Sequence, residues 1–214
     1  MEIDDDYYNN LKWNVVRAFS HLGFIRIPVD PVELMESAGI RVIPYSEGID
    51  MWDQAKRTMS GGCPSGISFT LHKPDGTTER FACYNNYEPA TRNRFTESHE
   101  AGHCFLGHKA DSRTAEREAN FWARYAIAPP VLIHRLQLSS GEEVAKEFGL
   151  SQECAGYAYD FYLKWLRHRK ADKAIDDAIL RLYDKGLMLD DPKADSPLDD
   201  STIELLTGKG TPAK

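Results

Sequence analysis

Residues 95–106 carry the sequence FTESHEAGHCFL, in which His99 and His103 frame an H-E-x-x-H motif. Residues four apart lie on one face of an α-helix, so the two imidazoles can bind one metal ion. Glu100 points about a quarter turn away, where its carboxylate can hold and deprotonate a water without occupying the metal. The motif therefore predicts a helix that carries the arrangement used in zinc-assisted hydrolysis.

A second helical segment, expected over residues 114–127, offers a third ligand. One of its faces combines polar and small side chains, namely Glu116, Ala119, Asn120 and Ala123. Gly102, in the middle of the motif helix, costs about 1 kcal/mol relative to alanine, which makes sense where another backbone approaches closely. We expect Glu116 to be the third zinc ligand and Asn120 to hydrogen-bond an imidazole or the ligand carboxylate, with Glu118 pointing the other way.

His108 is a rival third ligand. The metzincin pattern H-E-x-x-H-x-x-G-x-x-H places a glycine and a histidine three and six residues after the second histidine, whereas Gly107 and His108 stand at four and five. The spacing favours His108 as an end-of-helix residue that lines the cleft. The donor that stabilises an oxyanion is not identified by spacing, and the candidates are His108, Tyr84 and Tyr125.

The rest of the chain places strands early and helices late. Helices are predicted over residues 4–22 and from Asp30-Pro31 to Gly39, followed by a strand over residues 40–44. A β-hairpin is predicted from residues 66–71 and 78–84. Further helices are expected over residues 92–106, 114–127, 130–138 and 142–148, and from residue 152 onward. This order predicts an α+β fold over residues 1–188, and the acidic residues 189–214 are expected to form a solvated or partner-ordered tail.

Two segments allow alternative functions. Strand 78–84 precedes the motif helix and could hold a substrate along a sheet edge or lie in the sheet interior. Residues 140–170 resemble a helix-turn-helix, with a capping box at Ser140 and a turn at Gly149. The second helix of this segment brings Glu153 and Asp160 rather than arginines, so phosphate contacts would be poor and packing on the rest of the domain is favoured.

Charge, hydropathy and cysteine content indicate the cellular compartment and limit the classes of partner. The net charge of −7 over 214 residues argues against a broad non-specific grip on nucleic acid. The acidic N-terminus has no apolar signal region, and no stretch is long and apolar enough to cross a membrane. The four cysteines form no C-x-x-C pair, which is typical of reduced thiols. We therefore expect a cytoplasmic protein.

The run from Arg94-Phe95-Thr96 to Gly107-His108, together with residues 116–120 and Ala128-Pro129, resembles the ImmA/IrrE family of zinc metallopeptidases. The likeness covers about residues 40–166. It departs from the usual pattern at Glu97-Ser98, where the family commonly has leucine and alanine, and at Ala101, where leucine is frequent. These changes spare the ligands and affect the local packing and the substrate cleft.

The resemblance implies a small zincin-like fold with Zn²⁺ held by His99, His103 and Glu116 and with Glu100 as the catalytic acid and base. It also implies cleavage of a repressor-type regulator, hence a role in transcription regulation, and members often belong to prophages, mobile elements or stress-response loci. The alternative is a non-catalytic, zincin-fold interaction or DNA-linked module, such as a toxin–antitoxin or repressor partner; a third possibility is hydrolysis of a non-peptide amide. Glu100 favours an enzyme, because a structural zinc site has no need of a free carboxylate beside it.

Overall fold

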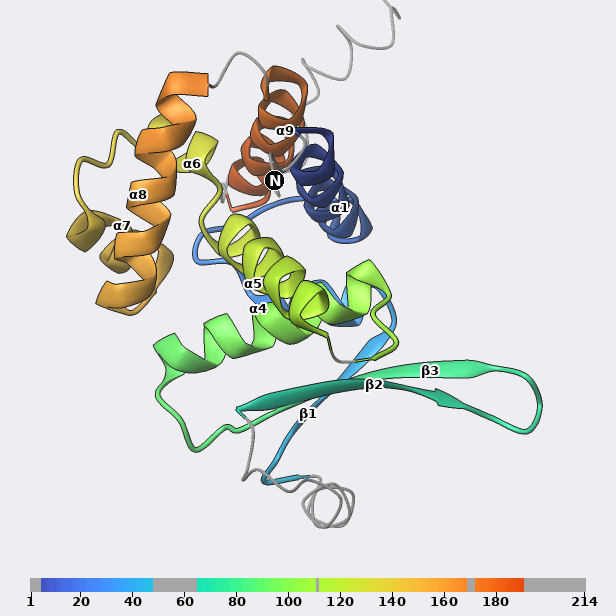
Figure 1. The fold of residues 1–214 in the computed structure, drawn as a ribbon. Helices are drawn as coiled ribbons and strands as arrows, with labels where there is room; N and C mark the ends of the chain where they lie inside the picture. Colours follow the sequence, from blue (N-terminus) through green and yellow to red (C-terminus); the bar gives the residue numbers. More distant parts are fainter. Residues whose placement is uncertain (1–4, 48–64, 111, 169–171, 191–214) are drawn as a thin grey trace, which may run out of the picture.

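A computed structural model describes residues 5–47, 65–110, 112–168 and 172–190 of the chain. The fold is α+β, with a small three-stranded sheet on one side and helices stacked above it (Figure 1). The helices and strands expected from the sequence are present at nearly the expected bounds. The tail expected over residues 189–214 lies outside the described residues from position 191 onward.

The sheet contains β1 (Ile40–Pro44), β2 (Gly66–His72) and β3 (Thr78–Tyr84) in the order β1-β3-β2. The predicted hairpin is confirmed, because β2 and β3 pair antiparallel and the turn between them places Gly76 at φ 82°. β1 pairs parallel with β3. Of the two alternatives for this strand, the structure shows the sheet interior, because both sides of β3 are paired; β2 is an edge of this sheet.

The motif helix α4 (Ala90–Leu106) packs on the sheet through β2 and β3, and α5 (Arg113–Ile127) packs on α4 (Figure 1). α4 ends at Gly107, whose φ of 70° is a left-handed conformation that glycine adopts without strain. α5 begins after Ser112, whose side chain accepts a hydrogen bond from the backbone N–H of Ala115. These two helices are the elements that carry the H-E-x-x-H motif and Glu116.

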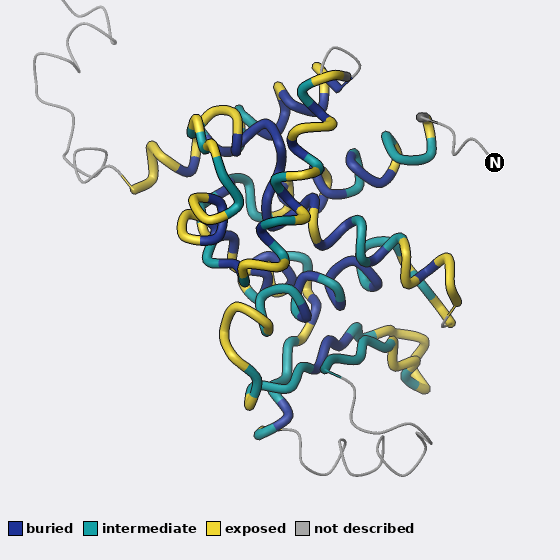
Figure 2. Tube along the Cα trace, turned by 60° about the vertical axis from the view of Figure 1, so that its left-hand side comes forward, coloured by how far each residue is buried: buried dark blue, intermediate teal, exposed yellow. Residues whose placement is uncertain are grey.

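Most of the remaining helices lie on the side of α5 and α4 that faces away from the sheet, and α2 (Pro31–Ser37) also contacts β1. The remaining helices are α1 (Asp5–Leu22), α2, α6 (Pro130–Arg135), α7 (Gly141–Phe148), α8 (Gln152–His168) and α9 (Lys173–Leu189). α6 is shorter than expected because Gln137 adopts a φ of 57° and the chain turns there. The buried residues concentrate in this helical part (Figure 2). No helix in the described ranges has the length and apolar character needed to span a membrane.

One polar link ties α1 to the two site helices. Asn14 Oδ1 accepts a hydrogen bond from Trp122 Nε1 at 2.7 Å, and Asn14 Nδ2 donates to the carbonyl of Phe105 at 3.0 Å. Trp122 is fully buried and its ring stacks on Phe105 at a centroid distance of 5.4 Å. The end of α4 is therefore fixed against α5 and α1 next to the motif.

Candidate metal centre

α4 presents the two motif histidines side by side. Their Nε2 atoms lie 3.0 Å apart, and only 16% of the His99 side chain and 10% of the His103 side chain are exposed. This is the arrangement that helical spacing of four residues predicts. Burial of the imidazole lowers the pKa of His99, while the charge of Glu116 and the amide oxygen of Asn120 as an acceptor oppose the shift. The net direction favours the neutral imidazole that a metal requires.

The close approach of α5 to α4 depends on Gly102. A Cβ at this position would lie 3.1 Å from Cα and 3.2 Å from the carbonyl oxygen of Ala119. Because Gly102 has no side chain and Ala119 has only a methyl group, the backbones of the two helices can approach closely. The expected packing of the motif helix on the small-residue face of α5 is confirmed.

This packing places Glu116 opposite the two imidazoles. Glu116 Oε2 lies 3.4 Å from His99 Nε2, and Oε1 lies 3.2 Å from His103 Nε2. Two ligand atoms each about 2.05 Å from a tetrahedral zinc ion are separated by about 3.3 Å. Within the described residues, His99, His103 and Glu116 form the one group of three or more potential ligands, with all ligand atoms within 4.8 Å of one another. The three side chains thus fit a zinc ion.

Glu100 lies on the sheet side of α4. Glu100 is only 6% exposed. The start of β2 packs directly on its side chain. A Cβ at Gly66 would stand 2.7 Å from Glu100 Oε1 and 2.8 Å from Thr96 Cγ2, so only glycine fits at this position. The charge of Glu100 also contributes to the raised pKa of Cys83 in β3, whose main cause is burial. The carboxylate is therefore held between α4 and the sheet edge that β2 forms.

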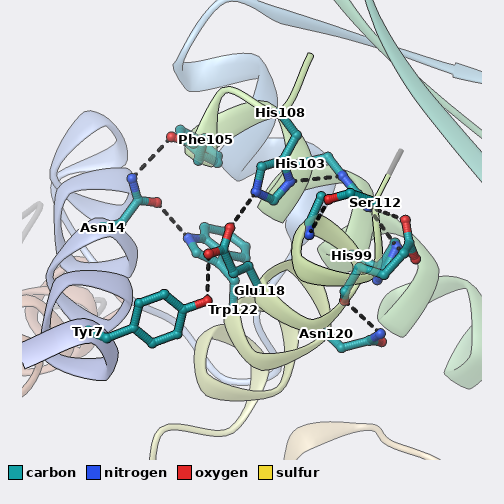
Figure 3. A network of polar contacts seen from close by, with 12 residues as sticks. Tyr7, Asn14, His99, His103, Phe105, His108, Ser112, Glu118, Asn120 and Trp122 are labelled. Atoms are coloured by element: carbon teal, nitrogen blue, oxygen red, sulfur yellow. Dashed lines mark hydrogen bonds and ion pairs between the residues drawn. The ribbon is translucent and has the colours of Figure 1, made fainter. Parts of the chain in front are cut away.

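Behind the ligands, a chain of polar contacts leads from His103 to α1 (Figure 3). His103 Nδ1 lies 3.0 Å from His108 Nδ1, and His108 Nε2 lies 2.8 Å from Glu118 Oε2. Tyr7 donates a hydrogen bond to Glu118 Oε1 at 2.5 Å. Although burial raises the pKa of Glu118, the hydrogen bonds from Tyr7 and His108 outweigh it and keep the pKa below its usual value. The chain of contacts therefore ends on an ionised carboxylate.

The carboxylate determines the direction of these hydrogen bonds. An ionised Glu118 only accepts, so His108 Nε2 must donate to it. When His103 donates through Nδ1, the other nitrogen of His108 is the acceptor at 3.0 Å. His103 is left with a lone pair on Nε2, the atom that faces His99 and Glu116. The three residues thus select the imidazole tautomer that can bind a metal.

The structure places the other expected site residues as follows. Asn120 lies one turn after Glu116 on α5, where its Nδ2 donates to the carbonyl of Glu116 at 2.8 Å, and it contributes to the electrostatic surroundings of His99. His108 supports His103 from behind the ligand pair, with both ring nitrogens engaged, instead of facing the cleft as an oxyanion donor. Glu118 does point away from Glu116, but toward His108, so it belongs to the centre.

The two tyrosines proposed as oxyanion donors lie in different elements, Tyr125 in α5 and Tyr84 at the end of β3. Tyr125 is 1% exposed in the core, where it stacks on Phe121, and burial raises the pKa of its hydroxyl well above the usual value. Nine residues of helix separate it from Glu116, a rise of about 13 Å. Burial raises the pKa of Tyr84, and the negative charge of Glu97 raises it further. Tyr125 nevertheless lines the same groove as Glu116 and Asn120, whereas Tyr84 does not line that groove.

Neither Tyr7 nor the contact of Glu118 with His108 was predicted from the sequence. Tyr7 stands 111 residues before Glu118, and no spacing rule links the two. Comparison with protein-family models and with curated proteins finds no match for the chain. The geometry of the centre is therefore the basis for assigning a function.

Proposed function

We propose that the chain is a cytoplasmic zinc metallopeptidase with a zincin-like fold, similar to the ImmA/IrrE family, that cleaves a repressor-type regulatory protein. The observation that carries the proposal is the triangle of His99, His103 and Glu116, with the buried Glu100 next to His99 in the sequence of the same helix. The hydrolysis expected from the H-E-x-x-H motif needs these four groups and a path by which a substrate can reach them. Access is available at Glu116, whose side chain is 49% exposed.

The residues divide the work of peptide hydrolysis. Zinc bound by three protein ligands acidifies water and polarises a carbonyl at its open position. Glu100 takes a proton from the attacking water and delivers it to the leaving amine. Packing on Gly66 fixes the carboxylate of Glu100 in place, so little reorganisation is needed at the moment of proton transfer. His108 and Glu118 hold the His103 ring in its metal-binding tautomer.

The donor set supports a catalytic site over a structural one. A structural zinc site closes all four positions with protein ligands, and here the described residues supply three. The fourth position would stay open for a water or a substrate. This combination favours the hydrolase over a zincin-fold module that only binds a partner.

Metal analysis provides the first test. Wild-type protein and Glu116→Ala are purified without added metal, dialysed against zinc and analysed for zinc per chain. We expect close to one zinc ion in the wild type and a clear loss in the variant, because a two-histidine site binds zinc much more weakly. A matched Glu142→Ala change, on an exposed part of α7, controls for loss of a surface carboxylate. A wild type that stays metal-free would reject the proposal.

Proteolysis provides the second test. Zinc-loaded wild type and Glu100→Gln are incubated with a cell extract, and new protein N-termini are labelled and identified by mass spectrometry. The wild type should generate one or a few new termini, and Glu100→Gln should bind zinc but generate none. Glu142→Gln, which removes an exposed carboxylate on α7, serves as the control and should cleave like the wild type. The same termini from Glu100→Gln would reject its role as general base.

A further inference from the structure

A groove of about 1000 Å³ runs beside the metal centre, between α5 and α8 and against the first turns of α1. Glu116 and Asn120 form part of its wall, so one end of the groove reaches the ligand set. The other end reaches Tyr157 and Lys164 on α8. The groove is therefore continuous with the place where a substrate bond would be cleaved.

The groove is basic although the chain as a whole is acidic. It is lined by four cations and two carboxylates, which gives a local charge of +2 on a chain of net charge −7. The cations are Arg113, Arg117, Arg124 and Lys164, and the carboxylates are Glu116 and Asp160. Among the described residues, Arg113, Arg124 and Lys164 take part in none of the ion pairs found. Arg117 interacts with the charge of Glu118, and Glu116 faces the histidines, so the three other cations and Asp160 keep the local surplus at +2.

The floor of the groove is aromatic. Phe121 packs against Tyr8 at a ring-centroid distance of 4.8 Å and against Phe161 at 5.9 Å, and all three line the groove. At the rim, the Tyr157 ring is 51% exposed and the Arg124 guanidinium lies 5.0 Å from its centroid. Aromatic floors with charged rims are typical of surfaces that hold a protein segment by apolar anchors and position it by charge.

We propose that this groove docks an acidic segment of the protein substrate, with aliphatic or aromatic side chains spaced between its carboxylates. The proposal rests on the peptidase function and names the substrate class for the same site. The acidic side chains would meet Arg113, Arg124 and Lys164 on the two walls, and the apolar ones would cover Phe121. Docking next to Glu116 raises the effective concentration of the scissile segment at the metal centre.

The lining favours a peptide over a nucleic acid. Asp160 stands on one wall among the cations, and a continuous chain of phosphates would be repelled there. A peptide can place its carboxylates only opposite the arginines and Lys164. The rings of Tyr8, Phe121 and Phe161 pack against one another, and Tyr157 at the rim is exposed. A single-stranded nucleic acid binds by stacking its bases on exposed rings, and this groove offers few of them.

The test uses a display library of random linear peptides, selected on the full-length protein with zinc and again after removal of zinc by a chelator. The peptides recovered on the wild type should have a negative mean charge and an excess of Leu, Phe, Tyr or Trp. Their affinity, measured by fluorescence anisotropy on the recovered sequences, should fall roughly tenfold in the variant Arg124→Glu/Lys164→Glu, which reverses one charge on each wall. The loss should shrink as the salt concentration rises.

The matched control is Arg181→Glu/Lys146→Glu, which reverses two exposed cations outside the groove. This control should bind the recovered peptides like the wild type. Neutral or basic recovered peptides, equal losses in both double variants, or tighter binding of single-stranded oligothymidylate than of any recovered peptide would each overturn the docking proposal. Because binding is measured without cleavage and without zinc, its failure is distinct from failure of the peptidase proposal, which zinc analysis and the Glu100→Gln comparison decide.

Discussion

Replacement of His108 tests whether the contacts behind the metal centre control zinc binding. In His108→Phe the ring keeps its place, but His103 Nδ1 loses the acceptor that lies 3.0 Å away and Glu118 loses the donor at 2.8 Å. His103 is then free to carry its proton on Nε2, the atom that must bind zinc. Loss of such an outer hydrogen bond typically weakens metal binding 10- to 100-fold, which corresponds to about 1.4–2.7 kcal/mol.

The position of each residue in the chain of contacts predicts a graded series. His108→Phe should have the largest effect, near 100-fold, because it abolishes the contact to His103. Glu118→Gln keeps an acceptor oxygen but removes the charge, so about tenfold is expected. Tyr7→Phe removes only the outermost hydrogen bond and should change the zinc dissociation constant by less than about threefold. His108→Asn, whose side-chain oxygen can accept from His103, should recover part of the loss.

The assay is competition for zinc against a chromophoric chelator, with thermal unfolding of the zinc-free proteins measured in parallel. Weakened zinc binding with little change in zinc-free stability would identify a positioning role. If His108→Phe bound zinc like the wild type, or if the order of effects followed the loss of zinc-free stability, the assigned tautomer control would be wrong.

Three further outcomes are expected. Gly66→Ala should lower proteolysis roughly 10- to 100-fold without loss of zinc, because its Cβ would stand 2.7 Å from Glu100 Oε1; full activity would show that the carboxylate is not held there. Gly102→Val should lower the free energy of unfolding of the zinc-free protein by about 2 kcal/mol in urea titrations, since the new side chain meets the backbone of α5; an unchanged value would contradict the close approach. Burial, followed by the charge of Asp172, raises the pKa of Asp176 to about 7, so the folded state binds more protons than the unfolded state between about pH 4 and 7 and the stability due to this group falls as pH rises through that window. Asp176→Asn should therefore flatten the decline, and an identical pH profile in the variant would count against this account.

Much of the local structure follows from the sequence because it depends on neighbours in the chain. Turn and alternation signals predict the hairpin of β2 and β3, and Asp30 caps α2 as expected by accepting hydrogen bonds from two backbone N–H groups. The gap at Gly102 and the small-residue face of α5 together predict the helix pair and the position of Glu116, rather than Glu118, next to the two histidines. Each of these inferences uses spacings of two to four residues, which backbone geometry converts directly into contacts.

Other features depend on contacts between distant parts of the chain. The sequence predicts β3 as a strand, but its central place arises from the parallel pairing with β1, some forty residues earlier. Tyr125 has the polar tip of a cleft residue, yet the packing of α8 on α5 buries it in the core. Such outcomes depend on how the elements are arranged, which periodicity does not specify.

The sequence by itself determined the helix that carries His99 and His103, the adjacent carboxylate of Glu100 and the partner helix that brings Glu116. These depend on the fixed rise and turn of an α-helix. Only the tertiary structure decided that His108 and Glu118 select the tautomer of His103, and that cations from α5 and α8 line one groove beside the centre. The physical reason is that hydrogen-bond direction and local charge depend on groups brought together from separate helices and loops, whose distances no local spacing sets.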